Sequence, residues 1–176
     1  MSIVNLPLII LVVAGTLGAI DVFYYHLYRF RLFARTECVA EEITHLVRHA
    51  VFLALIVLLS SGSSRRAVDF TILGLFALDV ANSAVDVLLE RRSREALGGL
   101  PSGEYLVHIL SSLGVGAAVA TYVLARPTLP LPEPEGLLAL QVGGMLAVGA
   151  LLFLVEAAFF LAMLAGSSRE KAIGLR

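Results

Sequence analysis

The segment Glu41-Glu42-Ile43-Thr44-His45-Leu46-Val47-Arg48-His49 stands at the start of a long apolar stretch and combines acidic with imidazole side chains. At about 100° per residue, Glu42, His45 and His49 fall within roughly 60° of one another around a helix. The segment therefore predicts a helix that begins at the edge of a membrane and presents one carboxylate and two imidazoles on the same face.

The composition of the whole chain predicts an integral membrane protein. Of its 176 residues, 59% are hydrophobic and only 15% are charged, and the mean hydropathy is +0.90. A soluble domain of this size could not bury so much apolar surface, so the lipid bilayer is the expected partner. The formal net charge is −1 and no basic tract stands out, which argues against a nucleic-acid partner. The single cysteine, Cys38, excludes an intramolecular disulfide and is interpreted as a small residue near a helix start.

Five apolar segments are long enough to cross a bilayer as helices when their amphipathic ends are included. We therefore expect an all-α fold, with residues 1–176 forming one transmembrane domain. The predicted spans cover residues 3–26, 43–61, 67–90, 104–125 and 136–165.

The distribution of basic residues predicts the orientation of these spans. Three of the 13 basic residues, Arg65, Arg66 and Arg126, fall on one side of the membrane, and the others fall on the opposite side. Positive charges concentrate on the cytoplasmic side of membrane proteins, so we expect the N-terminus outside and the C-terminus in the cytoplasm. The expected location is the inner (cytoplasmic) membrane.

Polar residues gather at one depth although the chain reverses direction between spans. With a rise of 1.5 Å per residue, Asp21 lies about 12 Å in from Arg29, and Asp86 about 8 Å in from Arg91. Corresponding estimates place His45 and His108 at a similar level, which predicts a polar site that faces the cytoplasm.

The third span carries several candidates for this site. Asp79 and Glu90 lie roughly 16 Å apart along their helix, so both cannot bind one compact centre. We favour Asp86, with Glu90 next and Asp79 as a further candidate. On the first span, His26 lies about 140° around the helix from Asp21, so we expect it to face lipid headgroups or another helix.

Acidic residues outnumber fixed positive charges in this region. An isolated ionised carboxylate inside a membrane costs roughly 2.5–3.5 kcal/mol or more, and Arg48 is the only basic residue placed among these acids. Protons, juxtamembrane arginines or metal ions must compensate. Carboxylates and imidazoles together form the ligand set of a metal centre, here predicted to comprise Asp21, Glu42, His45, His49, Asp86, Glu104 and His108.

The pattern Glu42-x-x-His45, with carboxylates at Asp21, Asp86 and Glu104 and a second imidazole at His108, resembles the di-iron carboxylate four-helix bundles. The resemblance implies that the first four helices surround two iron ions. It also implies an oxidoreductase that uses dioxygen on a lipophilic substrate, with Tyr25 and Arg48 supporting the ligands or positioning the substrate. The pair Glu104 and His108 is spaced by four residues rather than three, which leaves room for zinc.

Three other functions remain open at this point. One is a zinc hydrolase of a lipid amide or ester, in which imidazoles hold the metal and a carboxylate acts as the base. Another is a haem carrier with two axial imidazoles. The last is a helical subunit, either of a homo-oligomer or of a larger membrane complex.

Overall fold

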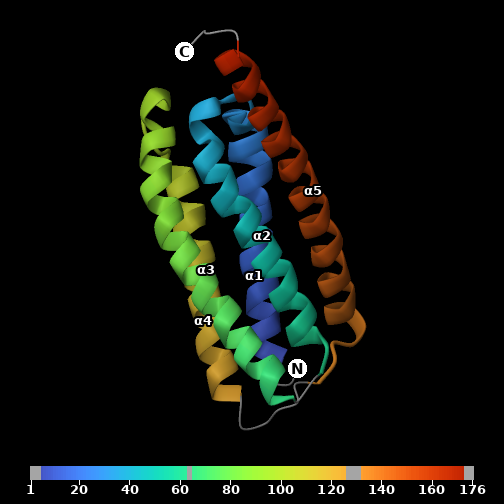
Figure 1. Ribbon diagram of the computed structural model, residues 1–176. Coiled ribbons are helices and arrows are strands. Elements are labelled where there is room, and N and C mark those ends of the chain that lie inside the picture. The colour runs from blue at the N-terminus through green and yellow to red at the C-terminus, as the bar shows by residue number, and fades with distance from the viewer. Residues whose placement is uncertain (1–4, 63–64, 126–131, 173–176) are drawn as a thin grey trace.

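The computed structural model describes residues 5–62, 65–125 and 132–172. Those residues form five long helices and no strand, which confirms the predicted all-α class (Figure 1). The helices are α1 (Leu6–Asp21), α2 (Val39–Ser60), α3 (Arg66–Ser93), α4 (Ser102–Ala125) and α5 (Gly136–Ala172). The predicted start of the first span at residue 3, and Arg126, lie outside the described residues.

Each of the five helices is long and apolar enough to cross a membrane. The spans are Leu6–Arg29, Val39–Ser60, Arg66–Ser93, Ser102–Ala125 and Gly136–Gly166. The first includes η2 (Val22–Arg29), a π-helix that continues α1 without a break. The second starts four residues earlier than predicted, which places Glu41 and Glu42 in the first turn of α2, where the helix dipole favours acidic side chains.

The long helices lie side by side, and consecutive helices run in opposite directions (Figure 1). α1 lies along α4, and α2 lies along α3. α5 packs against α2 and, less extensively, against α1, so it also covers the interior. α4 contacts α3 only lightly.

The interior divides into an apolar half and a polar half. The apolar core contains Leu8 and Leu11 of α1, Ile56 and Leu59 of α2, and Phe76 of α3. The polar half lies toward the α1–α2 and α3–α4 connections, where α1 and α3 end and α2 and α4 begin. The chain therefore brings the ends of four helices, and the later part of α5, around one group of buried polar residues.

A close approach of α1 and α4 depends on two small residues. A Cβ atom built on Gly114 would lie 2.8 Å from the Cβ atom of Ala14, which is closer than side-chain carbons approach. Small residues at a helix contact are typical of membrane bundles, because they let the two backbones come together.

Candidate metal centre

The π-helix η2 brings His26 to the interior beside Asp21. Nε2 of His26 lies 3.5 Å from Oδ2 of Asp21, and only 2% of the His26 side chain is exposed. In a π-helix the backbone bonds from residue i to residue i+5, as in the 2.9 Å bond from the Phe30 amide to the Tyr25 carbonyl, so residues five apart lie one above the other. The expected angle of about 140° between His26 and Asp21 assumed α-helical geometry throughout the first span; of the two expected surroundings, lipid headgroups or another helix, the structure shows the second, with His26 beside Glu104 of α4 and His45 of α2.

One group of side chains that could hold a metal ion consists of Asp21, His26, Glu104 and His108, and it is called here the first ligand group. One ligand atom from each of them lies within 4.8 Å of the others. Nε2 of His108 is 2.6 Å from Oδ2 of Asp21, and Nε2 of His26 is 3.5 Å from Oε1 of Glu104. This group joins α1, η2 and α4.

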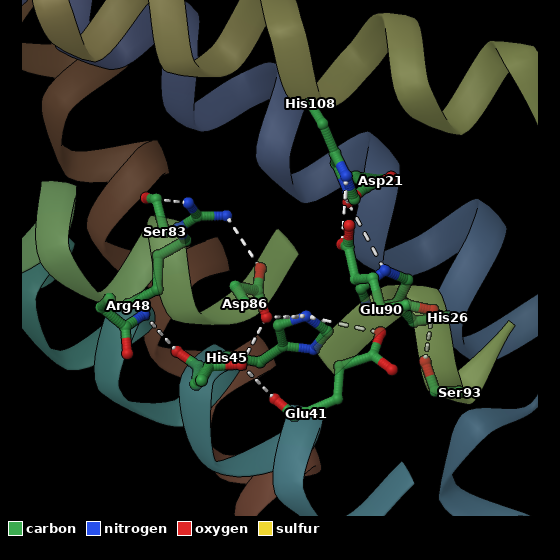
Figure 2. A network of polar contacts seen from close by, with 12 residues as sticks. Asp21, His26, Glu41, His45, Arg48, Ser83, Asp86, Glu90, Ser93 and His108 are labelled. Atoms are coloured by element: carbon green, nitrogen blue, oxygen red, sulfur yellow. Dashed lines mark hydrogen bonds and ion pairs between the residues drawn. The ribbon is translucent and has the colours of Figure 1, made fainter. Parts of the chain in front are cut away.

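A second ligand group consists of Glu41, His45 and Glu90, and a third consists of His26, His45 and Glu156. Glu41 and His45 are one turn apart on α2, with Nε2 of His45 3.9 Å from Oε1 of Glu41. The rings of His26 and His45 stack with their centroids 4.4 Å apart. The ligand groups are therefore neighbours, and Figure 2 shows His26, His45 and His108 among carboxylates of several helices.

Arg94, which follows α3, is fully buried between two of these acids. Its Nη1 donates to Oε2 of Glu41 at 3.0 Å, and its Nη2 donates to Oε1 of Glu104 at 2.5 Å. Burial opposes the charge of Arg94, but the hydrogen bond with Glu104 and the charges of Glu41 and Glu104 outweigh burial and raise the pKa of Arg94 above its ordinary value. The expectation that Arg48 is the only cation among the buried acids is therefore wrong.

Arg48 lies at a second point of the polar interior. Its Nη1 is 3.5 Å from Oδ2 of Asp86, its Nε is 3.8 Å from Oδ1 of Asp79, and it donates a hydrogen bond to Ser83. Asp86 also accepts a hydrogen bond from Thr44. These partners occupy the oxygens of Asp86, which belongs to none of the three ligand groups although Nε2 of His45 is only 3.5 Å away.

Acidic groups still outnumber the arginines in this interior. All eight of the acids concerned are at most 6% exposed, and Arg48 and Arg94 contribute two positive charges. Buried charges require a partner, because the membrane interior solvates them poorly. The eight are Asp21, Glu41, Glu42, Asp79, Asp86, Glu90, Glu104 and Glu156.

Several buried ligand atoms have no hydrogen-bond partner among the described residues. Both ring nitrogens of His26 are in this position, as are Nδ1 of His45 and one oxygen of Asp21. Unpaired buried nitrogen and oxygen atoms are costly, whereas a metal ion accepts their lone pairs. The chemistry of the donor set therefore fits transition-metal ions of the kind that bind imidazole and carboxylate.

Other predicted site residues lie near the ligand groups but outside them. Nδ1 of His49 is 2.7 Å from Oε2 of Glu156, so His49 contacts a member of the third ligand group. Glu42 is buried, with one unpartnered oxygen. Tyr25 is buried with its hydroxyl against Gly103, at the start of α4, so its contacts support that helix.

A cavity of about 90 Å³ adjoins the cluster. Asp21, His26, His45 and His108 line it, together with apolar residues such as Phe52. This space admits several waters, but it is far below the roughly 300–1,000 Å³ of pockets that enclose drug-sized ligands. With His26 and His45 stacked on each other, the arrangement argues against haem.

Sequence reasoning gave no ligand role to four of the residues found here. Nothing in the sequence indicated that His26 lies on the same face as Asp21, because a π-helix changes the number of residues per helical turn. Glu41 could have been found from its spacing of four before His45, whereas the spacing of Arg94 four after Glu90 indicates a different partner from Glu41 and Glu104, the acids that Arg94 contacts. Glu156 is the acid of the fifth apolar segment, and a single carboxyl in such a segment gives no sign of which other helices it faces.

Comparisons with protein-family models, with curated proteins and with solved structures find no match to this chain.

Proposed function

We propose that this chain is a membrane-embedded metalloprotein that binds two transition-metal ions, of which iron is the first choice, and acts as an oxidoreductase on a lipophilic substrate. The observation that supports it most is the adjacency of the ligand groups. They meet at the stacked rings of His26 and His45, in an interior with more carboxylates than arginines. An intramembrane cluster of this kind usually marks function.

The ligand groups suggest which residues would hold the ions. The first group supplies two carboxylates and two imidazoles for one ion. Glu41, His45 and Glu90, with Glu156 close to His45, are the donors for the other. Arg94 would hold Glu41 and Glu104 in place through its hydrogen bonds, as outer partners of metal ligands do.

Two iron ions in such a site supply dioxygen binding and electron transfer when they are bound. The residues of the chain bind and orient the reactants, exclude bulk water and move protons. Glu90 suits proton movement, since its buried Oε1 lies 3.1 Å from Nδ1 of His108 and has no hydrogen-bond partner among the described residues. Oxidation of the substrate releases two protons with two electrons, and dioxygen takes four electrons from two substrate molecules to form water.

We also propose that the first four helices form the bundle around this centre, with α5 adding Glu156. The distribution of basic residues supports an N-out and C-in orientation. This orientation would put the centre near the cytoplasmic face of the inner membrane.

Zinc is the alternative metal, and one observation favours it. The third ligand group has two imidazoles and one carboxylate, which is the donor set of several zinc hydrolases. With zinc, a bound water would act on a lipid amide or ester and a neighbouring carboxylate would accept its proton.

Metal analysis of protein purified in mild detergent without chelators tests the proposal. We expect about two equivalents of iron per chain. Zinc without iron, together with activity in the absence of oxygen, would support the hydrolase instead. Less than about half an equivalent of any transition metal would contradict both functions.

A further inference from the structure

A second cavity, of about 660 Å³, lies between α3 and α4. These two helices contact each other only lightly, so a groove remains between them. Val87 of α3 and Leu113 of α4 line the groove and are 61% and 65% exposed, which places them on an outer face of the bundle. In a membrane-spanning chain that face meets lipid, and the groove therefore opens sideways into the bilayer.

The inner end of this groove reaches the candidate metal centre. His108 and Ser112 line both this groove and the central cavity. Glu90, a member of the second ligand group, also lines the groove and is 2% exposed. Its Oε1 lies 3.1 Å from Nδ1 of His108 but without hydrogen-bond geometry to any described residue, so this buried oxygen is free to accept a hydrogen bond.

We infer that the groove binds a lipid of the quinol class, with its ring against Glu90 and His108 and its apolar tail between α3 and α4. This inference rests on the proposed function, because the electrons of the quinol need the metal centre as their acceptor. The volume lies within the range of pockets that enclose a small organic molecule. Ser112 and Gly116, one turn apart on α4, line the groove, and their small side chains leave it open there.

The negative charge of Glu90 favours a ligand with an uncharged headgroup over a phospholipid. Glu90 at the inner end repels a phosphate in a medium of low dielectric constant, whereas a quinol hydroxyl donates a hydrogen bond to it. Arg91 lines the groove as well but is exposed, so phosphate groups of the bilayer surface can neutralise it outside. The inner end therefore matches the hydroxyl donors of a quinol.

The electrons and protons of quinol oxidation balance with dioxygen as the oxidant. Both O–H bonds of the quinol break as it becomes a quinone, the two electrons pass to the metal centre, and the two protons leave one after the other through the Glu90 carboxylate to the dioxygen that is being reduced. Two quinols then supply the four electrons and four protons that convert one dioxygen molecule into two waters.

A photoreactive benzoquinol with an alkyl tail tests the binding site. Purified protein is irradiated with this probe, and the labelled peptides are identified by mass spectrometry. We expect labels on α3 and α4 along the groove. An excess of unlabelled benzoquinol should remove them, and an excess of phosphatidylcholine should not.

Two glycine variants supply a matched comparison. A Cβ atom on Gly116 or on Gly144 of α5 would meet nothing within 4 Å, so both positions have room for the first atom of a side chain. Gly116→Leu fills the groove and should lower groove labelling by on the order of tenfold, which corresponds to about 1.4 kcal/mol of binding free energy. Gly144→Leu should leave labelling unchanged.

Metal content measured on the same samples separates this inference from the proposed function. Labelling that Gly116→Leu removes while metal content stays at the parent value supports the inference. Groove labelling in protein that contains no metal would support the binding site but contradict the proposed function. Labelling that is insensitive to Gly116→Leu, or that phosphatidylcholine removes as well as benzoquinol does, would show a groove filled by bulk lipid and overturn the inference.

Discussion

The rings of His26 and His45 stack with their centroids 4.4 Å apart, although they come from the π-helix η2 and from α2. Both rings belong to the third ligand group, and each also belongs to one of the other two groups, so this contact joins the three groups into one cluster. Stacked imidazolium rings would repel each other, whereas neutral rings can bind metal through their lone pairs.

The four histidines therefore differ in their expected effect on metal binding. His26→Ala, His45→Ala and His108→Ala each remove a member of a ligand group and should lower bound metal to less than about half of the parent value. His49→Ala removes only a partner of Glu156. The affinity of this variant for metal should fall by roughly 10-fold to 100-fold, but the variant should still bind metal at saturating concentrations. Metal analysis and titration of the purified variants provide the measurement. Loss of metal in His49→Ala alone would contradict this assignment.

The sequence was sufficient for the helical class and for the level at which polar residues gather, because both follow from hydrophobicity and chain reversal. Asp21, His45, Glu104 and His108 were all predicted as ligands; the structure brings each of them into a group of side chains that could hold a metal ion, and metal binding itself stays a prediction. His26 could not be predicted, because nothing in the sequence shows that Val22–Arg29 forms a π-helix. The pairing of Asp86 with Thr44 and Arg48 also depends on how α2 and α3 face each other, which periodicity does not give.

Arg94 should be essential to stability because it is the only described cation within ion-pair distance of Glu41 and Glu104 other than histidine. Removing one partner of a buried charge pair costs about 3–5 kcal/mol, so Arg94→Met should lower the unfolding temperature markedly. Arg92→Met, at an exposed position two residues away, should change stability by no more than about 0.5 kcal/mol. Thermal unfolding in detergent measures both.

A second substitution tests whether Arg94→Met loses stability because it leaves buried acids without a positive charge. Glu104→Gln in the Arg94→Met background removes one of the uncompensated acids and should recover part of the lost stability. No recovery, or equal effects of Arg94→Met and Arg92→Met, would show that the ion pairs contribute little.

Cys38 should be unreactive in the folded protein. Its side chain is fully buried, and burial together with the charge of Glu41 raises the pKa of the Cys38 thiol to about 12. At neutral pH the reactive thiolate is therefore scarce. Native protein should resist a maleimide reagent and react after denaturation. Ala40→Cys in a Cys38→Ser background, which places a thiol at an exposed position nearby, should react at once; rapid reaction of native Cys38 would contradict the burial.

The contact between Gly114 and Ala14 should tolerate no added methyl group. Gly114→Ala would place its Cβ atom 2.8 Å from that of Ala14, which cannot rotate away, so α1 and α4 must separate. Forced overpacking costs about 1–3 kcal/mol, which should exceed the roughly 0.5–1 kcal/mol that Ala gains over Gly within a helix. Gly116→Ala, on the same helix but facing open space, should be neutral or stabilising.

Ala14→Gly should rescue Gly114→Ala in thermal unfolding, because it restores the space between the two backbones. If Gly114→Ala proved as stable as Gly116→Ala, α1 and α4 would not pack as closely as the structure has them.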